Sequence, residues 1–202
     1  MAVKEKKILS YDIENSYGDI AVCAVDEAGR GPLCGPVYAA AVILPRGLVI
    51  EGLDDSKKLS EKKRELLFDE IIKDAEAYSI AFATVEEIDE LNILNATMLA
   101  MRRAINGLKI KPDLALIDGN IARDMPVEAK TVIKGDSKSP SIAAASILAK
   151  VSRDRVCEEL DRLYPEYGIA KHKGYCTAYH VEMLKKYGAA ECHRKTFLKN
   201  IL

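Results

Sequence analysis

The chain has 202 residues, of which 49% are hydrophobic and 30% are charged, and these proportions exclude a largely disordered protein. Its 30 basic and 31 acidic residues leave a net charge of −1, which taken alone argues weakly against a nucleic-acid partner. A chain of this length is expected to fold as one domain, residues 1–202, and no apolar run approaches the ~18 residues of a membrane span.

The predicted elements begin with a pair of strands. A buried strand over residues 19–25 ends in an acidic, glycine-rich turn, and a second strand over 37–44 follows closely enough to be its antiparallel neighbour. Ser60 is a predicted helix N-cap, and Ser139-Pro140 opens a long helix that ends near Leu163. The other predicted segments are strands at 78–85, 114–117 and 130–134 and helices at 86–106 and 178–187. This order predicts an α/β fold in which helices flank a mixed sheet.

The end of the chain differs from the rest in its charge. From Lys171 onward the sequence contains seven Lys or Arg residues and two Glu residues, a net charge of +5. A solvated basic surface is the simpler interpretation; the alternative is that the acidic residues elsewhere lie where a metal covers them. We expect residues of about 164–202 to form a C-terminal helical extension.

Three predicted strand ends deliver acidic side chains into loops, and each lies near a glycine: Asp26-Glu27, Asp118 and Asp136. Ligands of open α/β sheets gather at strand ends. Neighbouring Asp26 and Glu27 would point to opposite faces of a regular strand, so both reach one site only if the strand breaks, which Ala28-Gly29 would allow. For any one of these acids a plain turn residue is the simpler interpretation, but together they indicate a site.

Converging carboxylates cannot all stay ionised without a counter-cation. Oxygen ligands of this kind suit Mg²⁺ or Mn²⁺. Two such ions about 4 Å apart would support in-line hydrolysis of a phosphodiester.

One block of the sequence is highly specific: residues 26–32 are Asp-Glu-Ala-Gly-Arg-Gly-Pro, and Gly-Pro-Val follows at 35–37. Shorter blocks follow in order, namely DSKKL at 55–59, IDGN at 117–120, KGDSK at 134–138, SIAAASILAK at 141–150, RD at 153–154, YG at 167–168, HKGY at 172–175 and HRKTF at 193–197. Together they resemble the ribonuclease HII family, and the resemblance covers about residues 20–197.

The resemblance implies a ribonuclease H-like fold and a metal-dependent endonuclease that cuts the RNA strand of RNA/DNA hybrids. It also implies cutting on the 5′ side of a single ribonucleotide embedded in duplex DNA, with 3′-hydroxyl and 5′-phosphate ends. Carried onto this chain, the catalytic and metal-binding acids are Asp26, Glu27, Asp118 and Asp136, with Mg²⁺ or Mn²⁺, two ions in the reactive complex, as cofactor. Asp154 competes for fourth place, but it lies roughly 20 Å along the long helix from its start, and we expect it to pair with a neighbouring arginine.

Several other residues are candidates for holding the substrate. In the family, the turn Gly29-Arg30-Gly31 contacts the 2′-hydroxyl of the ribonucleotide; a plain tight turn is the alternative. Ser141 lies where helix N-terminal amides could face a phosphate. The ring of Tyr175 could stack on the next nucleotide, or it could be an ordinary core or surface tyrosine. Candidate phosphate contacts, each equally interpretable as a solvated lysine, are Lys57, Lys58 and Lys138.

The five cysteines are odd in number and contain no C-x-x-C pair, which fits reduced thiols better than a disulfide framework. Residues 1–15 lack the continuous apolar stretch of a secretory signal, so we expect a cytoplasmic protein. Four residues near the C-terminus raise the question of zinc, but their spacings match no common zinc pattern and no metal is expected there: His172, Cys176, Cys192 and His193.

Three alternatives fit the sequence less well. Ribonuclease HIII carries an N-terminal substrate-binding domain, and only 25 residues precede Asp26. Ribonuclease HI and related resolvases and integrases do not usually present adjacent Asp-Glu in such a turn. A nucleic-acid-binding module without catalysis is opposed by the acids at all four positions. We further expect a monomer, and no sliding-clamp binding through the last eight residues, KTFLKNIL, which lack glutamine and paired aromatics.

Overall fold

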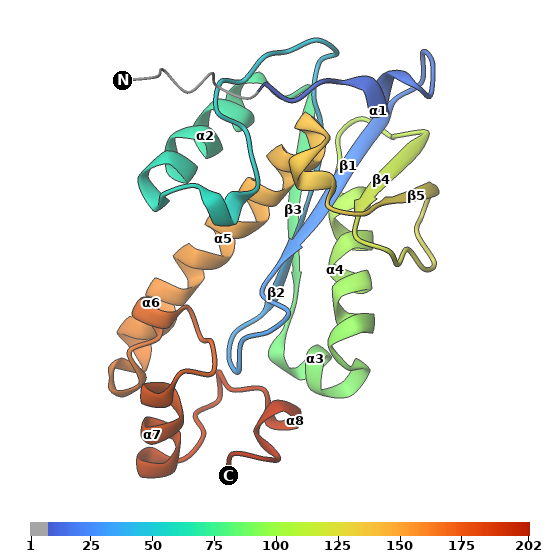
Figure 1. The fold of residues 1–202 in the computed structure, drawn as a ribbon. Helices are drawn as coiled ribbons and strands as arrows, with labels where there is room; N and C mark the ends of the chain where they lie inside the picture. The colour runs from blue at the N-terminus through green and yellow to red at the C-terminus, as the bar shows by residue number, and fades with distance from the viewer. Residues whose placement is uncertain (1–7) are drawn as a thin grey trace, which may run out of the picture.

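The computed structural model describes residues 8–202, and in it a mixed sheet of five strands stands between two layers of helices (Figure 1). The prediction about a secretory signal falls partly on residues 1–7, which lie outside the described residues. The strands run in the spatial order β3-β2-β1-β4-β5 and are β1 (Val22–Ala28), β2 (Val37–Ile43), β3 (Ala77–Ala83), β4 (Leu114–Asp118) and β5 (Glu128–Val132). β1 pairs antiparallel with β2 and parallel with β4, which confirms the predicted mixed sheet.

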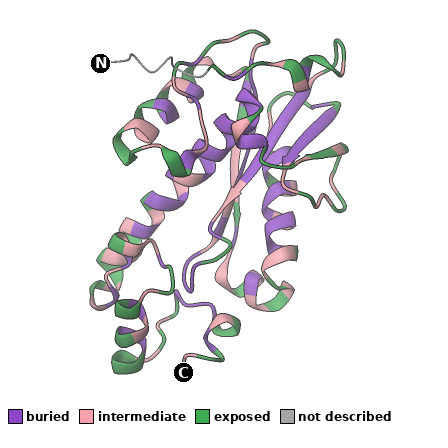
Figure 2. Cartoon of the chain, in the orientation of Figure 1, coloured by how far each residue is buried: buried purple, intermediate pink, exposed green. Residues whose placement is uncertain are grey.

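The two faces of the sheet carry separate hydrophobic cores, because side chains alternate along each strand. Val22 and Ala24 of β1 pack with α2 (Glu61–Asp74) and α5 (Pro140–Leu163) on one face. Cys23 and Val25 pack with α4 (Ile93–Asn106) on the other. The first half of α5 is buried throughout (Figure 2), and three successive alanines, 143–145, let it lie close to the sheet.

Several predicted boundaries are wrong: the strand expected at 130–134 is β5 at Glu128–Val132, and the largest differences concern β1 and the helix after β3. β1 does not end at Val25, because its register with β2 continues to the pair Ala28–Tyr38. The helix predicted over 86–106 is two helices, α3 (Val85–Leu91) and α4, separated by Asn92. Asn92 has a positive φ of 69°, and its side chain accepts hydrogen bonds from the N–H groups of Leu94 and Asn95, so it ends one helix and caps the next.

The remaining described elements are short. They are α1 (Asp12–Asn15), η1 (Ser56–Lys58), η2 (Gly135–Ser137), η3 (Pro165–Tyr167), α6 (Ile169–His172), α7 (Ala178–Tyr187) and α8 (Lys195–Leu198). No helix among the described residues is long and apolar enough to cross a membrane.

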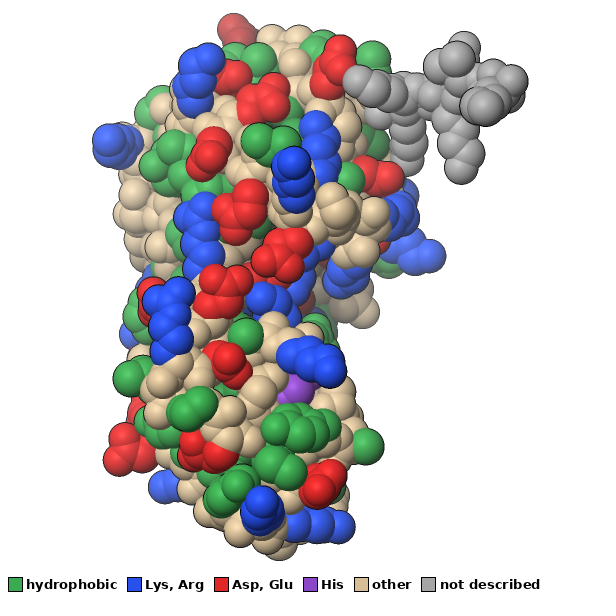
Figure 3. All heavy atoms as spheres, turned by 90° about the vertical axis from the view of Figure 1, so that its left-hand side faces the viewer, with side chains coloured by type: hydrophobic (Ala, Val, Ile, Leu, Met, Phe, Trp, Pro, Cys, Tyr) green, Lys and Arg blue, Asp and Glu red, His purple; other side chains and the backbone are tan. Residues whose placement is uncertain are grey.

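The predicted C-terminal extension consists of η3, α6, α7 and α8, and it packs around a third, smaller core that includes Leu33 and Cys34 of the β1–β2 loop. Charged side chains of both signs intermingle over the face formed by α2, α5 and α7 (Figure 3). One of the seven basic residues of this end of the chain, Arg194, is fully buried and adds nothing to a basic surface.

The start of α5 is covered by the N-terminal helix. Ser139 caps α5 with its hydroxyl, which accepts from the N–H of Ile142 and donates to Glu14 at 2.6 Å. Glu14 also accepts from the N–H of Ser141, which is buried. The first amides of α5 are therefore occupied by a protein carboxylate rather than presented to a ligand.

The guanidinium of Arg194 joins the end of the chain to the β1–β2 loop. It donates to four backbone carbonyl oxygens of that loop: Gly29 at 2.6 Å, Arg30 at 3.0 Å, Pro32 at 2.8 Å and Gly35 at 2.9 Å. The backbone adds further bonds, from Arg194 N–H to Leu33 and from Gly35 N–H to Cys192, each 2.8 Å. A flexible glycine-rich loop is thus held at several points by one side chain.

We predict that Arg194→Lys lowers the free energy of unfolding by about 3 kcal/mol, because one ammonium cannot satisfy four buried carbonyl groups that a planar guanidinium serves together. The neighbouring Lys195 is exposed, and Lys195→Ala serves as the control with an expected change within about 0.5 kcal/mol. Urea unfolding followed by circular dichroism measures both. Wild-type stability of Arg194→Lys would show that these hydrogen bonds are dispensable.

Candidate active site

A cavity of about 460 Å³ opens beside the carboxyl end of β1. Most of the site residues proposed from the sequence line it: Asp26, Glu27, the turn Gly29-Arg30-Gly31, Lys57 and Tyr175. These residues come from β1, the loop after it, η1 and the C-terminal extension. The fold thus gathers groups that are far apart in the sequence.

Asp26 is buried, with 6% of its surface exposed, and lies on the face of β1 that meets α5. Its Oδ1 accepts from the N–H of Glu27 at 2.7 Å. Burial raises its pKa well above the usual range, and the charges of Glu27 and Asp118 raise it further against a hydrogen bond from Ser146. A carboxylate in this setting is unfavourable without a nearby cation.

Glu27 lines the same cavity as Asp26. The expectation that β1 must break to allow this is wrong, because the pairing of β1 with β2 continues through Glu27 to Ala28. The pairing of β1 with β4 ends at Val25, so the edge of β1 beyond it is open on that side. Burial raises the pKa of Glu27, while Arg30, 3.4 Å away, lowers it in part. Both adjacent acids line the cavity at this end of β1, which has no β4 partner beyond Val25.

Asp118 is the last residue of β4, and Asp136 lies in η2. The two are linked through Gly135, whose N–H donates to Asp118 Oδ1 at 2.6 Å. A side chain at Gly135 would collide with Ile142 Cδ1, 2.4 Å from an ideal Cβ, so this approach needs glycine. Burial raises the pKa of Asp136, and the charges of Asp55 and Asp118 add to the effect.

This donor set fits hard divalent cations. Asp118 raises the pKa of each of the other three acids, so all four share one electrostatic environment. Bound Mg²⁺ or Mn²⁺ would relieve this repulsion with the oxygen ligands that both ions prefer. Within the described part of the chain, the four carboxylates are too spread for any three to have oxygens within 4.8 Å of one another.

The substrate-binding candidates Gly29, Arg30, Gly31, Lys57 and Tyr175 line the same cavity as Asp26 and Glu27. An ideal Cβ on Gly31 would be 3.4 Å from the ring of Tyr175, so the half-exposed ring faces the glycine turn directly. Gly29 has a φ of +100°, and a Cβ there would lie 2.1 Å from Arg153 Nε. Lys57 lowers the pKa of both Glu27 and Asp136, which places its ammonium near the acids.

Three residues weighed from the sequence have other roles. Ser141 does not reach the cavity, because it is buried and bonded to Glu14 at the covered start of α5. Lys138 donates to the carbonyl of Ile133 at 2.8 Å. Asp154 pairs with Lys150 at 2.6 Å and with Arg64 at 3.5 Å, which accords with its expected pairing to an arginine.

The sequence analysis missed several residues of the cavity wall. Ser146 shares a 2.9 Å hydrogen bond with Ser56, and together they support Asp26 from behind. Arg153 packs against Gly29 and donates to the carbonyl of Lys173 at 3.0 Å. Ser56, Ser146 and Arg153 all lie inside sequence blocks that carry the family resemblance, and this position could have marked them as candidates. Their hydrogen-bond partners, however, follow only from the tertiary structure.

Comparisons with known proteins identify the family to which the chain belongs. The family model described as Ribonuclease HII matches residues 23–200. A ribonuclease HII of Caldicellulosiruptor bescii is 59% identical over 181 residues, which cover 90% of this chain and 88% of that protein. The crystal structure of ribonuclease H2 from Pyrococcus horikoshii OT3 matches with a TM-score of 0.70 at 30% identity, covering 88% of this chain and 93% of that one.

Bst-RNase HIII, solved in complex with Mn²⁺, matches with a TM-score of 0.70 at 20% identity, over 89% of this chain and 68% of that one. At that identity the likeness shows the fold alone, and the manganese belongs to that protein. The predicted ribonuclease H-like fold is confirmed, as is the resemblance drawn from the motifs. With a matching family model over nearly the whole chain and a relative of 59% identity, this chain belongs to the ribonuclease HII family of nucleases.

Proposed function

We propose that this nuclease hydrolyses the RNA strand of RNA/DNA hybrids and cuts on the 5′ side of single ribonucleotides in duplex DNA, leaving 3′-hydroxyl and 5′-phosphate ends. The observation that carries the proposal is the cavity in which the acidic residues meet a glycine turn and an exposed aromatic ring. The acidic residues suit phosphodiester hydrolysis, and the glycine turn with the aromatic ring suits recognition of one sugar.

Four carboxylates bind the divalent ions: Asp26, Glu27, Asp118 and Asp136. Two bound ions would supply an activated water and neutralise charge at the phosphate. Asp26 is oriented by the N–H of Glu27 and by Ser146, and Asp118 by the N–H of Gly135, so their oxygens are held before any substrate arrives. Lys57 sits near two of these acids and can contact a phosphate.

Recognition of a ribonucleotide requires a group that reads its 2′-hydroxyl. The turn Gly29-Arg30-Gly31 offers backbone groups without side chains at two of its three positions, so a sugar can approach closely. Arg194 holds the carbonyls of Gly29 and Arg30, and with them the conformation of the turn. Tyr175, facing Gly31, offers an apolar surface for the deoxyribose that follows.

A cleavage assay on duplex DNA with one embedded ribonucleotide, with Mg²⁺ and with EDTA, tests the proposal. Cutting at the ribonucleotide with Mg²⁺ alone supports it. Binding without cutting would favour the non-catalytic binding module instead. The substrate-binding role of residues 164–202, a monomeric state, a cytoplasmic location and the lack of clamp binding through the last eight residues stay predictions.

We predict that Asp26→Asn and Asp118→Asn each lower kcat by at least about 100- to 1000-fold while leaving the fold intact, because each removes charge that positions ions and water at the phosphate. Asp136→Asn is expected to be similarly impaired. Asp154→Asn is the matched control and should keep substantial activity, since Asp154 pairs with Lys150 and Arg64. An active Asp136→Asn beside an inactive Asp154→Asn would overturn the assignment of the fourth acid.

We predict that Tyr175→Ala lowers kcat/KM on the single-ribonucleotide duplex by about 10- to 100-fold, the loss expected when one stacking contact worth about 1–3 kcal/mol is removed. Tyr175→Phe keeps the ring and should lose less. Tyr179 is equally exposed but lies outside the cavity, so Tyr179→Ala is the control. Unchanged activity of Tyr175→Ala would remove this residue from the site.

The raised pKa of Asp26 has a consequence for stability. Because the folded-state pKa lies above the unfolded value of about 3.9, the folded protein binds a proton that the unfolded chain releases, and stability falls as pH rises through the folded pKa. In EDTA at pH 7, Asp26→Asn should therefore raise Tm by about 2–4 °C, the shift that corresponds to ~1 kcal/mol. Thermal melts from pH 4 to 8 measure it; a lower Tm for Asp26→Asn would contradict this account.

A further inference from the structure

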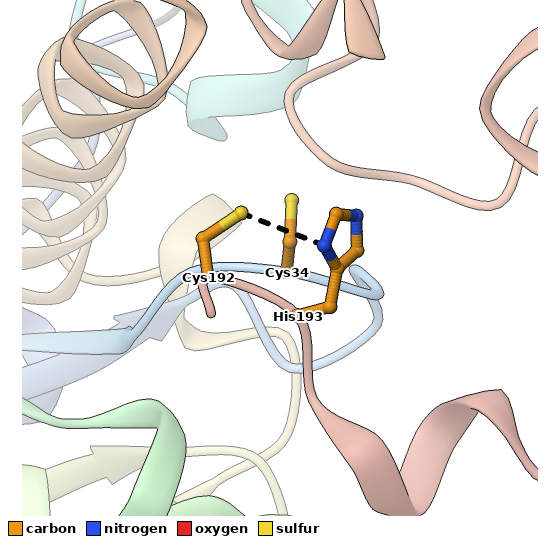
Figure 4. Close-up of side chains that lie close together, drawn as sticks. All are labelled: Cys34, Cys192 and His193. Atoms are coloured by element: carbon orange, nitrogen blue, oxygen red, sulfur yellow. Dashed lines mark hydrogen bonds between the residues drawn. The ribbon is translucent and has the colours of Figure 1, made fainter. Parts of the chain in front are cut away.

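A second group of metal-ligating side chains lies away from the acids, where the β1–β2 loop meets the end of the chain. Cys34, Cys192 and His193 are all buried, and their two sulfurs and Nδ1 lie within 4.8 Å of one another (Figure 4). The Cys192 sulfur is 3.6 Å from His193 Nδ1. Among the residues that the structure describes, this is the one group of three potential ligands held so closely.

The separations suit one ion between the three groups. Zinc–sulfur bonds of about 2.3 Å and zinc–nitrogen bonds of about 2.0 Å in tetrahedral geometry place neighbouring ligand atoms roughly 3.5–3.8 Å apart. The backbone sets these positions in advance: Cys34 pairs with His193 in an antiparallel bridge, and Gly35 N–H donates to the Cys192 carbonyl at 2.8 Å. Closing such a site would replace the hydrogen bond that Ala190 N–H donates to His193 Nδ1, while the backbone of all three residues is already in place.

A second observation concerns the orientation of the imidazole. His193 Nδ1 accepts from the N–H of Ala190 at 3.1 Å, a hydrogen bond that an ion on Nδ1 would replace, and in either case the ring proton resides on Nε2, which lies 3.0 Å from His180 Nε2. His180 in turn bonds through Nδ1 to the carbonyl of Tyr175 at 3.0 Å. A ligating histidine ordinarily donates its remote N–H to an acceptor that fixes the ring, and His180 is that acceptor here.

The charged side chains next to Cys34 are both positive. Arg153 and Arg194 are buried beside Cys34, and within the described chain no carboxylate forms an ion pair with either. Two thiolates would neutralise a divalent ion, so the complex would add no net charge next to the guanidiniums.

We propose that Cys34, Cys192 and His193 form a Zn²⁺ site separate from the acidic site. Two thiolates and an imidazole are ligands that zinc prefers, and three protein ligands leave one position for solvent. Cys192 also lines a cavity of about 270 Å³ near the end of α5, which gives the ion a route to the site. The bound ion would fasten the loop of the glycine turn to the C-terminal segment and, through His180, to the backbone of Tyr175.

The sequence-based expectation of no metal rested on four C-terminal residues. Two of them, His172 and Cys176, are not in the group, and Cys34 takes their place from the other end of the chain. Spacing patterns detect ligands that share one local segment, so a ligand contributed by a distant loop gives no such signal.

The test uses the full chain, freed of metal and kept reduced, with excess Mg²⁺ to occupy the acids, and titrates it with Co²⁺ as a spectroscopic substitute for zinc. We expect one Co²⁺ per chain with a thiolate-to-cobalt charge-transfer band in the near ultraviolet, displaced by Zn²⁺. Cys34→Ala and Cys192→Ser should abolish the band, whereas Cys176→Ser, which changes an exposed thiol outside the group, should retain it. His180→Asn should weaken cobalt binding about 10- to 100-fold.

Folding of each variant is checked by circular dichroism in EDTA, and zinc should raise the Tm of the wild type but not that of Cys34→Ala. Absence of the charge-transfer band, or an equal band in Cys34→Ala and the wild type, would overturn the proposal. Asp26→Asn should keep the band, so the outcome is independent of the proposed hydrolytic function.

Discussion

A buried guanidinium holds the most important loop of this protein in place. The segment after β1 contains three glycines and two prolines within residues 29–36, and Arg194 donates to four of its carbonyl groups. Such a loop has little packing of its own and would sample many conformations without an external restraint. Because Leu33 N–H also donates to the carbonyl of Gly174, the glycine turn and the ring of Tyr175 form one unit with the C-terminal extension. The extension is therefore part of the active-site wall.

The acidic residues, unlike Arg194, destabilise the fold locally. Asp26, Glu27 and Asp136 all have a raised pKa, chiefly because they are buried. A site that must hold cations is destabilising when they are absent, and the stable core on both faces of the sheet offsets that cost. Under the proposed function, the same repulsion would give the site its affinity for divalent ions, so metal binding and reduced intrinsic stability would have one origin.

The two proposed metal sites differ in chemistry and in what they serve. Oxygen ligands at strand ends suit hard ions that act on a phosphate, whereas two thiols and an imidazole suit a softer ion that fastens backbone segments. The imidazole chain from His193 through His180 to the carbonyl of Tyr175 connects the second site to the first. Both proposed sites consequently adjoin the stretch of backbone that lines the cavity beside Tyr175.

The sequence by itself determined the family and the mixed sheet and indicated which acids to examine, since the motif from Asp26 to Pro32 and the strand-end acids are local patterns. It did not determine where β1 ends, because pairing with β2 carries that strand through Glu27 to Ala28. Nor did it show that Glu14 covers the start of α5 and withdraws Ser141 from the site. Arg194 belongs to the block at 193–197, but the sequence does not show which groups it contacts. Cys34 lies far along the chain from the other potential metal ligands Cys192 and His193. Contacts between segments more than a hundred residues apart leave no trace in local spacing, and only the closed tertiary structure could decide them.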